Sequence, residues 1–273
     1  MNNLKKEMGM KKIIVVTGAS SGMGREFVLQ ISEKEEVDEI WVIARNKERL
    51  DELKKAVSTK IVPISMDLTD REQIKKNYLA RLKKEKPEVQ ILANCAGFGI
   101  FDHTENIDTD TLVNMVDLNV TAYVALISYT LPYMKRGGKI MNISSCAGFQ
   151  PIPYINCYAA TKAFVTSYSR ALLREVKHRG IHVLTVTPFW TETRFFDRAI
   201  DTNKEKVVIN YAAMYDSAKV MKKAIRDLYN GKEFSCYGFI NNAQWLLVRL
   251  LPKKLVMAIW MKSQKLNGTP KIR

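Results

Sequence analysis

Short apolar runs alternate with longer stretches that mix apolar and polar positions along most of the chain. The runs are rich in β-branched residues, which is typical of buried parallel strands. They predict strands at Lys11–Thr17, Glu39–Ala44, Lys60–Ser65, Val89–Ala93, Lys139–Ile143 and Ile181–Thr187. The mixed stretches predict helices from Gly22 to about Lys34, Lys47 to Ala56, Asp70 to about Lys84, Thr109 to about Met134, and Tyr154 to Arg179.

Strands that alternate with helices in this way build crossover units and a parallel sheet covered on both faces. The pattern therefore predicts an α/β fold, a Rossmann-type doubly wound parallel sheet in three layers. Because no linker or repeat divides the chain, we expect one domain, with residues 1–232 as its body and residues 233–273 as a helical C-terminal extension. Ligands of such sheets bind beyond the carboxyl ends of the strands.

The C-terminal extension has its own helical pattern over residues 239–266, interrupted at Pro252. An amphipathic pattern is first of all a core-facing one, so we expect a helix hairpin packed on the body or on a second subunit. A lid over a pocket and a peripheral membrane contact are the alternatives, and the membrane contact is not favoured. The apolar positions are Ile240, Ala243, Leu246, Leu247, Leu250, Leu251, Leu255, Val256, Ile259 and Trp260, and the basic ones are Arg249, Lys253, Lys254, Lys262 and Lys265.

Composition narrows the setting in which this fold works. Residues 1–12 lack the apolar segment of a secretory signal, and the uncharged stretch Leu118–Met134 falls short of the roughly 20 apolar residues of a membrane span. The four cysteines form no C-x-x-C pair and the three histidines are scattered. We therefore expect no metal site and a reducing, cytoplasmic location.

The net charge of +15 fits either an anionic partner or a solvated, lysine-rich surface. Acidic and basic residues alternate along the early predicted helices, which favours the solvated surface for most of this charge. No nucleic-acid-binding motif is present, so we expect no nucleic-acid partner.

A glycine-rich loop joins the first predicted strand to the first predicted helix. Gly18 permits the tight turn, Gly22 lets the backbone approach a pyrophosphate, and Gly24 allows close packing of helix on strand. The helix N-terminus offers N–H groups and a positive dipole end to the phosphates. Between a strand and a helix this pattern predicts a dinucleotide site, with contacts from Thr17, Gly18, Ser20, Ser21, Gly22, Met23 and Gly24.

The end of the second predicted strand indicates which dinucleotide binds. NAD-binding sites usually carry an acid there, which bonds the ribose 2′-hydroxyl. Here the strand ends in Ala44 and is followed by Arg45, whose planar guanidinium can pair with a 2′-phosphate. We therefore expect NADP(H), although Arg45 could instead only begin a surface loop.

Further motifs follow in order: Asp67-Leu68, Asn94-Cys95-Ala96-Gly97, Asn119, Asn142-Ile143-Ser144-Ser145, and Tyr158-Ala159-Ala160-Thr161-Lys162. With the glycine loop they resemble the short-chain dehydrogenase/reductase family over roughly residues 11–232. Two positions depart from the family pattern: Cys95 replaces an asparagine, and Phe189 replaces the glycine that usually follows Pro188. The extension is similar to the tails of members that resemble 17β-hydroxysteroid and ketoacyl reductases.

The resemblance implies roles for single residues. Asp67 and Leu68 are expected to contact adenine, Asn119 to hold a water in a proton relay, and Thr193 to contact the nicotinamide carboxamide. The other implied cofactor contacts are Asn94, Ala96, Gly97, Tyr158, Lys162, Pro188 and Thr191. Relatives pair through two long helices, here about 109–134 and 154–179, so we expect a homo-oligomer, either a dimer or a tetramer.

Ser145, Tyr158 and Lys162 suit the reduction of a carbonyl, in which the cofactor supplies a hydride and a side chain supplies a proton. Tyr158 and Lys162 lie four positions apart on one helix face. We expect the Lys162 ammonium to lower the pKa of the Tyr158 phenol and to bond the nicotinamide ribose. Ser145 is expected to donate a hydrogen bond to the substrate oxygen. Each residue alone has an ordinary explanation, but beside a dinucleotide loop they predict a catalytic group.

Aromatic residues are frequent after the fourth, fifth and sixth predicted strands, which predicts an apolar pocket. We expect Phe98, Phe149, Tyr154, Phe189 and Trp190 to line it, although some such aromatics belong to the core. The predicted function is an NADP(H)-dependent oxidoreductase for a hydrophobic ketone and its secondary alcohol. The alternatives are a non-catalytic dinucleotide-binding regulator and a basic surface-binding protein on the same fold.

Overall fold

The computed structural model describes residues 10–193, 195, 207–211 and 213–266. A parallel sheet of seven strands forms its centre, in the order β3-β2-β1-β4-β5-β6-β9. The strands are β1 (Lys12–Thr17), β2 (Glu39–Ala44), β3 (Ile61–Ser65), β4 (Glu88–Asn94), β5 (Lys139–Ile143), β6 (His182–Val186) and β9 (Phe234–Ser235). The predicted three-layer α/β fold is confirmed.

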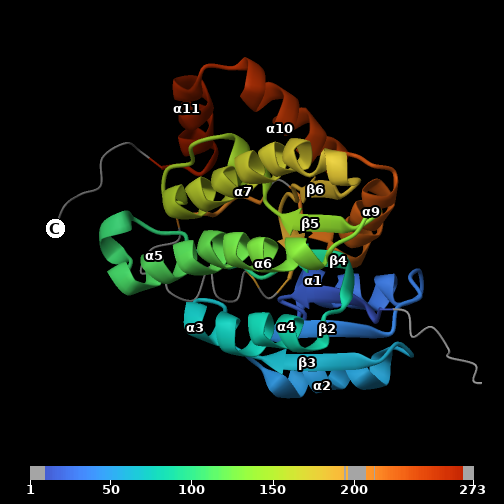
Figure 1. The fold of residues 1–273 in the computed structure, drawn as a ribbon. Coiled ribbons are helices and arrows are strands. Elements are labelled where there is room, and N and C mark those ends of the chain that lie inside the picture. The colour runs from blue at the N-terminus through green and yellow to red at the C-terminus, as the bar shows by residue number, and fades with distance from the viewer. Residues whose placement is uncertain (1–9, 194, 196–206, 212, 267–273) are drawn as a thin grey trace, which may run out of the picture.

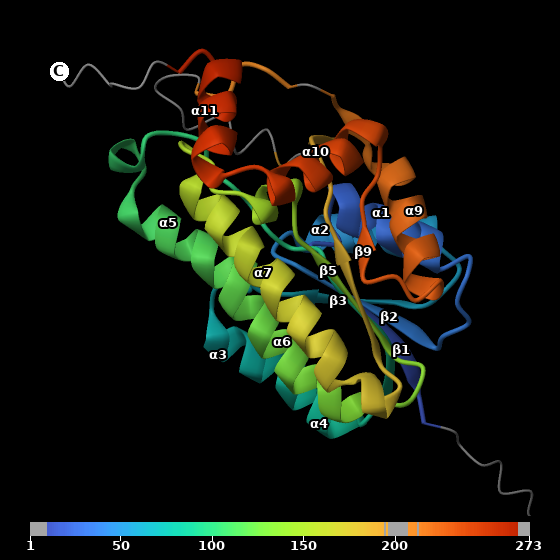
Figure 2. The same cartoon turned by 90° about the horizontal axis from the view of Figure 1, so that it is seen from above.

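Helices cover both faces of the sheet (Figures 1 and 2). One face carries α1 (Gly22–Ile31), α2 (Lys47–Ala56) and α9 (Ser217–Tyr229), and the other carries α3 (Arg71–Gln73), α4 (Ala80–Glu85), α5 (Thr109–Val116), α6 (Ala122–Thr130) and α7 (Asn156–Glu175). Each face has its own apolar core because parallel strands bury alternate side chains on both sides.

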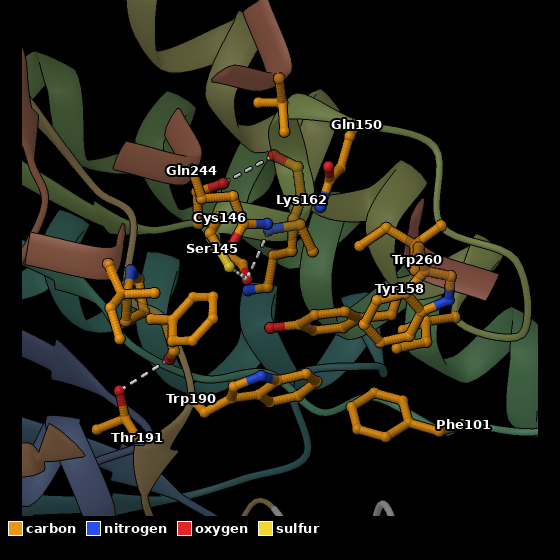
Figure 3. A pocket seen from close by; sticks show the side chains of 18 of the residues that line it. Phe101, Ser145, Cys146, Gln150, Tyr158, Lys162, Trp190, Thr191, Gln244 and Trp260 are labelled. Atoms are coloured by element: carbon orange, nitrogen blue, oxygen red, sulfur yellow. Dashed lines mark hydrogen bonds between the residues drawn. The ribbon is translucent and has the colours of Figure 1, made fainter. Parts of the chain in front are cut away.

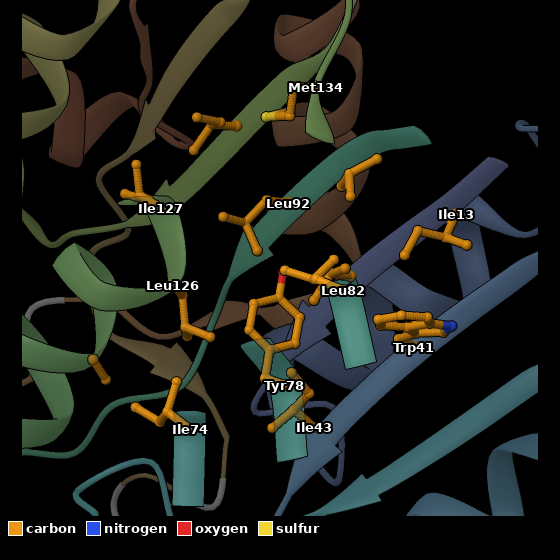
Figure 4. Close-up of a cluster of buried hydrophobic side chains, with 14 of the residues drawn as sticks. Ile13, Trp41, Ile43, Ile74, Tyr78, Leu82, Leu92, Leu126, Ile127 and Met134 are labelled. Atoms are coloured by element: carbon orange, nitrogen blue, oxygen red, sulfur yellow. The ribbon is translucent and has the colours of Figure 1, made fainter. Parts of the chain in front are cut away.

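The core beneath α4, α6 and α7 is built around two large aromatic residues (Figure 4). Tyr78 is fully buried and meets Trp41 edge to face, with 6.4 Å between the ring centres. The Tyr78 hydroxyl lies 2.6 Å from the hydroxyl of Thr130, so its polar end is satisfied inside the core. This packing fixes α4 and α6 against the sheet.

The helix predicted from Thr109 is one continuous structure with a widened turn in the middle. A π-helical turn at Asp117–Thr121 joins α5 to α6, and a 3₁₀ turn at Leu131–Tyr133 ends it. Among the described helices, Thr109–Tyr133 alone is long and apolar enough to span a membrane. Its Met115, Leu126 and Ile127 are fully buried, and 33% of its most apolar window is buried.

The C-terminal extension forms α10 (Phe239–Leu250) and α11 (Lys253–Ser263), with the predicted break at Pro252. The two helices meet at an angle at one end of the molecule (Figures 1 and 2). Trp260 Nε1 donates to the Pro153 carbonyl at 3.1 Å, and Gln264 bonds the backbone of Ile209 and Asn210. The hairpin therefore packs on the body, as favoured from its pattern.

Candidate active site

The glycine loop after β1 is built as its sequence predicts. Gly18 and Gly22 adopt positive φ angles of +65° and +51°, which glycine tolerates without strain. A Cβ atom on Gly24 would lie 2.4 Å from the Gly18 carbonyl oxygen, so only glycine permits this approach of α1 to the loop. Thr17 Oγ1 accepts hydrogen bonds from the N–H groups of Cys95 and Ala96, at 3.0 and 3.1 Å. These bonds tie together the loops after β1 and β4.

This loop and the start of α1 fit a dinucleotide pyrophosphate. The first turn of α1 holds no acidic residue that would oppose a phosphate, and its N–H groups have no helical acceptors of their own. Ser20, Ser21 and Met23 are partly accessible beside it. Further along the crevice, a Cβ atom on Gly97 would lie 2.9 Å from Asn119 Oδ1, so glycine keeps the chain tight at this point as well.

Arg45 stands directly after β2 with its side chain 67% exposed. Its nearest charged partner is Asp67, at 4.0 Å, a surface pair that contributes little stability and leaves the guanidinium available. Asp67 itself accepts hydrogen bonds from the Thr69 backbone and hydroxyl. Arg45 and Asp67 therefore lie together at the carboxyl edge of β2 and β3, where a ribose and an adenine would be bound.

Two expected cofactor residues have buried side chains. Asn94 is fully buried, and its Nδ2 donates to Asn142 Oδ1 at 2.9 Å across the paired strands β4 and β5. Leu68 is 5% exposed and packs in the core. Both side chains are buried, so the predicted cofactor contacts of Asn94 and Leu68 would come from their backbone atoms.

The three predicted catalytic side chains converge at the floor of one cavity (Figure 3). Tyr158 and Lys162 extend from α7, and Ser145 lies just beyond β5. Lys162 Nζ donates to the Ile143 carbonyl at 2.9 Å and lies 5.6 Å from the centre of the Tyr158 ring. Ser145 Oγ accepts from the Ala147 N–H at 3.1 Å, and its hydroxyl donates a long bond of 3.9 Å to Cys146 Sγ.

Burial dominates the electrostatics of this group. It raises the pKa of Tyr158 well above its ordinary value, although a hydrogen bond with Ser145 acts in the opposite direction. Burial also lowers the pKa of Lys162 to about 7. The expected lowering of the Tyr158 pKa by Lys162 is thus absent in the chain alone, because the lysine loses much of its own charge. Tyr158 keeps its proton, which is the state a proton donor requires.

The lowered pKa of Lys162 predicts a pH-dependent stability of the cofactor-free protein. The unfolded chain keeps this proton up to an ordinary pKa of 10.5, whereas the folded chain releases it at about 7. Between these values the unfolded state binds more protons, so the free energy of unfolding rises with pH. Urea unfolding at several pH values between about 7 and 10.5 measures this slope. Lys162→Met should remove the increment, and an identical slope in both proteins would contradict it.

Asn119 occupies the π-helical turn between α5 and α6 and is fully buried. Its Oδ1 accepts from the Phe98 N–H at 3.1 Å, and its Nδ2 donates to the Phe98 carbonyl at 2.8 Å and to Thr161 Oγ1 at 3.1 Å. π-Helical turns often mark functional positions. Here the turn holds the β4 loop beside α7, so Asn119 positions the catalytic helix as well as the cofactor crevice.

A cavity of 480 Å³ opens above the catalytic group. Phe189 and Trp190 line it, as predicted. The wall also includes five of the predicted cofactor contacts, Met23, Gly97, Pro188, Thr191 and Thr193. The other three expected pocket residues lie outside its wall as the described residues form it. Phe98 packs with Ile100 and Met115, Tyr154 meets His103 at a ring distance of 4.6 Å, and Phe149 packs on Phe234 and Trp245. These three aromatics pack against neighbouring residues and do not line the cavity.

The structure adds lining residues that the sequence did not single out. They are Gln150, Ile152, Ile155, Gln244 and Gln264, among others. Both C-terminal helices also contribute, through residues such as Leu247 and Trp260. Their helical pattern was compatible with a lid and with a packed hairpin. In the structure the hairpin packs on the body and also forms part of the cavity wall.

Comparison with known proteins agrees with this geometry. Residues 12–204 match the short chain dehydrogenase family model. Very-long-chain 3-oxoacyl-CoA reductase-B of Danio rerio is 29% identical over 269 residues, which are 93% of this chain and 80% of that protein.

Solved structures show the same fold. A short-chain dehydrogenase from Sphingobium yanoikuyae in complex with NADPH superposes with a TM-score of 0.72 at 23% identity, covering 96% of this chain and 98% of the other. A short-chain dehydrogenase/reductase from Burkholderia phymatum in complex with NAD gives 0.73 at 18% identity, covering 97% and 98%. This chain belongs to the short-chain dehydrogenase/reductase family of nicotinamide-dinucleotide-dependent oxidoreductases.

Proposed function

We propose that this protein is an NADP(H)-dependent oxidoreductase that interconverts a hydrophobic ketone and its secondary alcohol. The observation that carries the proposal is the convergence of Ser145, Tyr158 and Lys162 beneath a mostly apolar cavity that also reaches the glycine loop at Met23. An intact catalytic group speaks against a non-catalytic regulator. NADPH oxidation with a panel of hydrophobic ketones tests the proposal, and binding of NADPH without turnover of any ketone would favour the regulator.

The side chains divide the work of the reaction. A bound nicotinamide supplies or accepts the hydride. The Tyr158 hydroxyl donates its proton to the substrate oxygen during reduction. The Ser145 hydroxyl donates a hydrogen bond to the same oxygen and stabilises the charge that develops there. Lys162, held by the Ile143 carbonyl, would bond the nicotinamide ribose.

Arg45 supports NADP(H) over NAD(H). It is the exposed cation at the carboxyl end of β2, where an NAD-selective site usually carries an acid. Asp67 lies beside Arg45, and an acid at this edge would favour NAD(H). NADP(H) is preferred when the Arg45 guanidinium turns toward the 2′-phosphate.

The cavity wall supports an apolar substrate that carries a second polar group. Gln150 is 9% exposed and faces the cavity (Figure 3), and its side-chain amide has no hydrogen-bond partner among the described residues. An amide that faces the cavity and bonds no other side chain can bond a ligand group there, and the bond adds affinity. We infer that Gln150 binds a polar group of the substrate away from the reacting carbonyl.

Gln150→Leu tests this role. For a ketone with a second hydrogen-bonding group we expect kcat/KM to fall about tenfold, because the bond is lost. For the matched ketone without that group, the value should stay equal or rise. An equal loss for both ketones would show that Gln150 only shapes the cavity.

We propose a homo-oligomer and a cytoplasmic location. Val113 and Val116 on α5 and Phe164 on α7 are exposed apolar side chains on the two helices through which relatives pair.

All four cysteines are free thiols, which suits a reducing compartment. Most of the positive charge is dispersed over the surface, so no nucleic-acid partner is proposed.

A further inference from the structure

The hairpin α10–α11 exposes an apolar surface, although it packs on the body through its other side. Its buried side chains include Asn241, Val248 and Val256. Seven large apolar residues of these two helices are instead between 41% and 87% exposed, a density far above that of scattered surface residues. We call them the apolar rim: Phe239, Ile240, Leu246, Leu247, Leu250, Leu255 and Ile259.

The apolar rim forms one face and borders the cavity. On α10 the residues recur at helical spacing, so that Phe239, Leu246 and Leu250 share one side. On α11, Leu255 and Ile259 are four positions apart. Four rim residues are both exposed and part of the cavity wall, namely Phe239, Ile240, Leu247 and Ile259. The cavity therefore opens at this surface.

The charge around the apolar rim has a single sign. Residues 234–273 contain seven lysines and arginines and no aspartate or glutamate. Lys254 and Lys262 are exposed on α11 beside Leu255 and Ile259, and Arg249 stacks over Trp245 with its guanidinium 4.5 Å from the ring centre. A basic apolar helix face is the arrangement that binds the interface of an anionic bilayer.

We propose that the apolar rim docks on the surface of an anionic lipid bilayer. A second copy of this chain fits the surface less well. In a two-fold pair the same patch meets itself, which would place the basic residues against one another with no acidic residue in 234–273 to offset them. Docking places the cavity mouth at the lipid interface, so an apolar ligand could enter without crossing water. This last consequence rests on the proposed substrate class, but docking itself does not.

Co-sedimentation of the full chain with vesicles of defined lipid tests the proposal. We expect binding to vesicles that contain phosphatidylglycerol and much weaker binding to pure phosphatidylcholine, with the difference reduced at high salt. Leu246→Ser combined with Leu250→Ser should weaken binding at least about tenfold, since two lipid-facing side chains become polar. Lys254→Gln combined with Lys262→Gln should weaken binding only to the anionic vesicles.

The control is Met10→Ser combined with Met214→Ser, which removes exposed apolar side chains outside the extension. NADPH affinity and melting temperature are measured to show that each variant is folded. Both should be unchanged in the leucine variant, because Leu246 and Leu250 lie outside the cavity wall. Docking is overturned if the unaltered protein stays in solution, or if the leucine variant binds as the control does. It is also overturned if light scattering shows that the unaltered protein is an oligomer that does not bind vesicles, and that the leucine variant is not. The apolar rim would then be a contact between subunits.

Discussion

Tyr158→Phe is expected to lower kcat for ketone reduction by about 10²- to 10⁴-fold, because it removes the proton donor and leaves the ring in place. The Kd for NADPH should be unchanged, since the phenyl ring keeps its contacts with Phe101 and Phe195. Steady-state rates and a fluorescence titration with NADPH measure the two quantities on one sample.

Tyr154→Phe is the matched control, because it removes a tyrosine hydroxyl four positions away that lies outside the cavity wall. Its activity should equal that of the unaltered protein. If Tyr158→Phe retained more than a small fraction of the activity, another group would have to supply the proton, and the assignment of Tyr158 would be withdrawn.

Arg45→Asp is expected to weaken NADPH binding by about 10²-fold or more, because a charge-assisted contact with the 2′-phosphate is replaced by repulsion. NADH carries no such phosphate, so its Kd should change little or improve as the new carboxylate meets the 2′-hydroxyl. The ratio of the two Kd values is the quantity to measure.

Lys55→Asp makes the same change of charge on the neighbouring helix α2 and controls for the general field of the protein. It should leave the ratio nearly unaltered. Equal losses for NADPH and NADH in Arg45→Asp would mean that Arg45 supports the loop and does not recognise the phosphate.

The fold could be predicted because its strands are buried on both faces. A run such as Ile13–Val16 has no polar position, and every residue of it is fully buried. Strand β9 was not predicted, because a strand of two residues is too short to form an apolar run. It pairs only with Thr185 and Val186 of β6. The π-helical turn at Asp117–Thr121 was also beyond the pattern, because one additional residue in a turn hardly alters helical periodicity.

The catalytic group could be predicted because it depends on spacing along the chain, whereas the pocket depends on the direction of single side chains. Phe149 follows Ser145 closely and yet packs on Phe234 and Trp245, outside the cavity. Phe101 faces the cavity, where its ring lies 6.0 Å from that of Trp190. Composition cannot separate these two phenylalanines. Burial likewise raises the pKa of Tyr158, which Lys162 was expected to lower.

We propose that this chain transfers a hydride between NADPH and a hydrophobic ketone. The most direct test incubates the protein with NADPH deuterated at C4, on either face in turn, and a hydrophobic ketone, and follows the alcohol by mass spectrometry. We expect deuterium on the carbinol carbon from one of the two labelled cofactors, and at least about 10²-fold slower labelling with Tyr158→Phe. Oxidation of NADPH without a labelled alcohol, or no oxidation with any ketone of the panel despite tight NADPH binding, would contradict the claim.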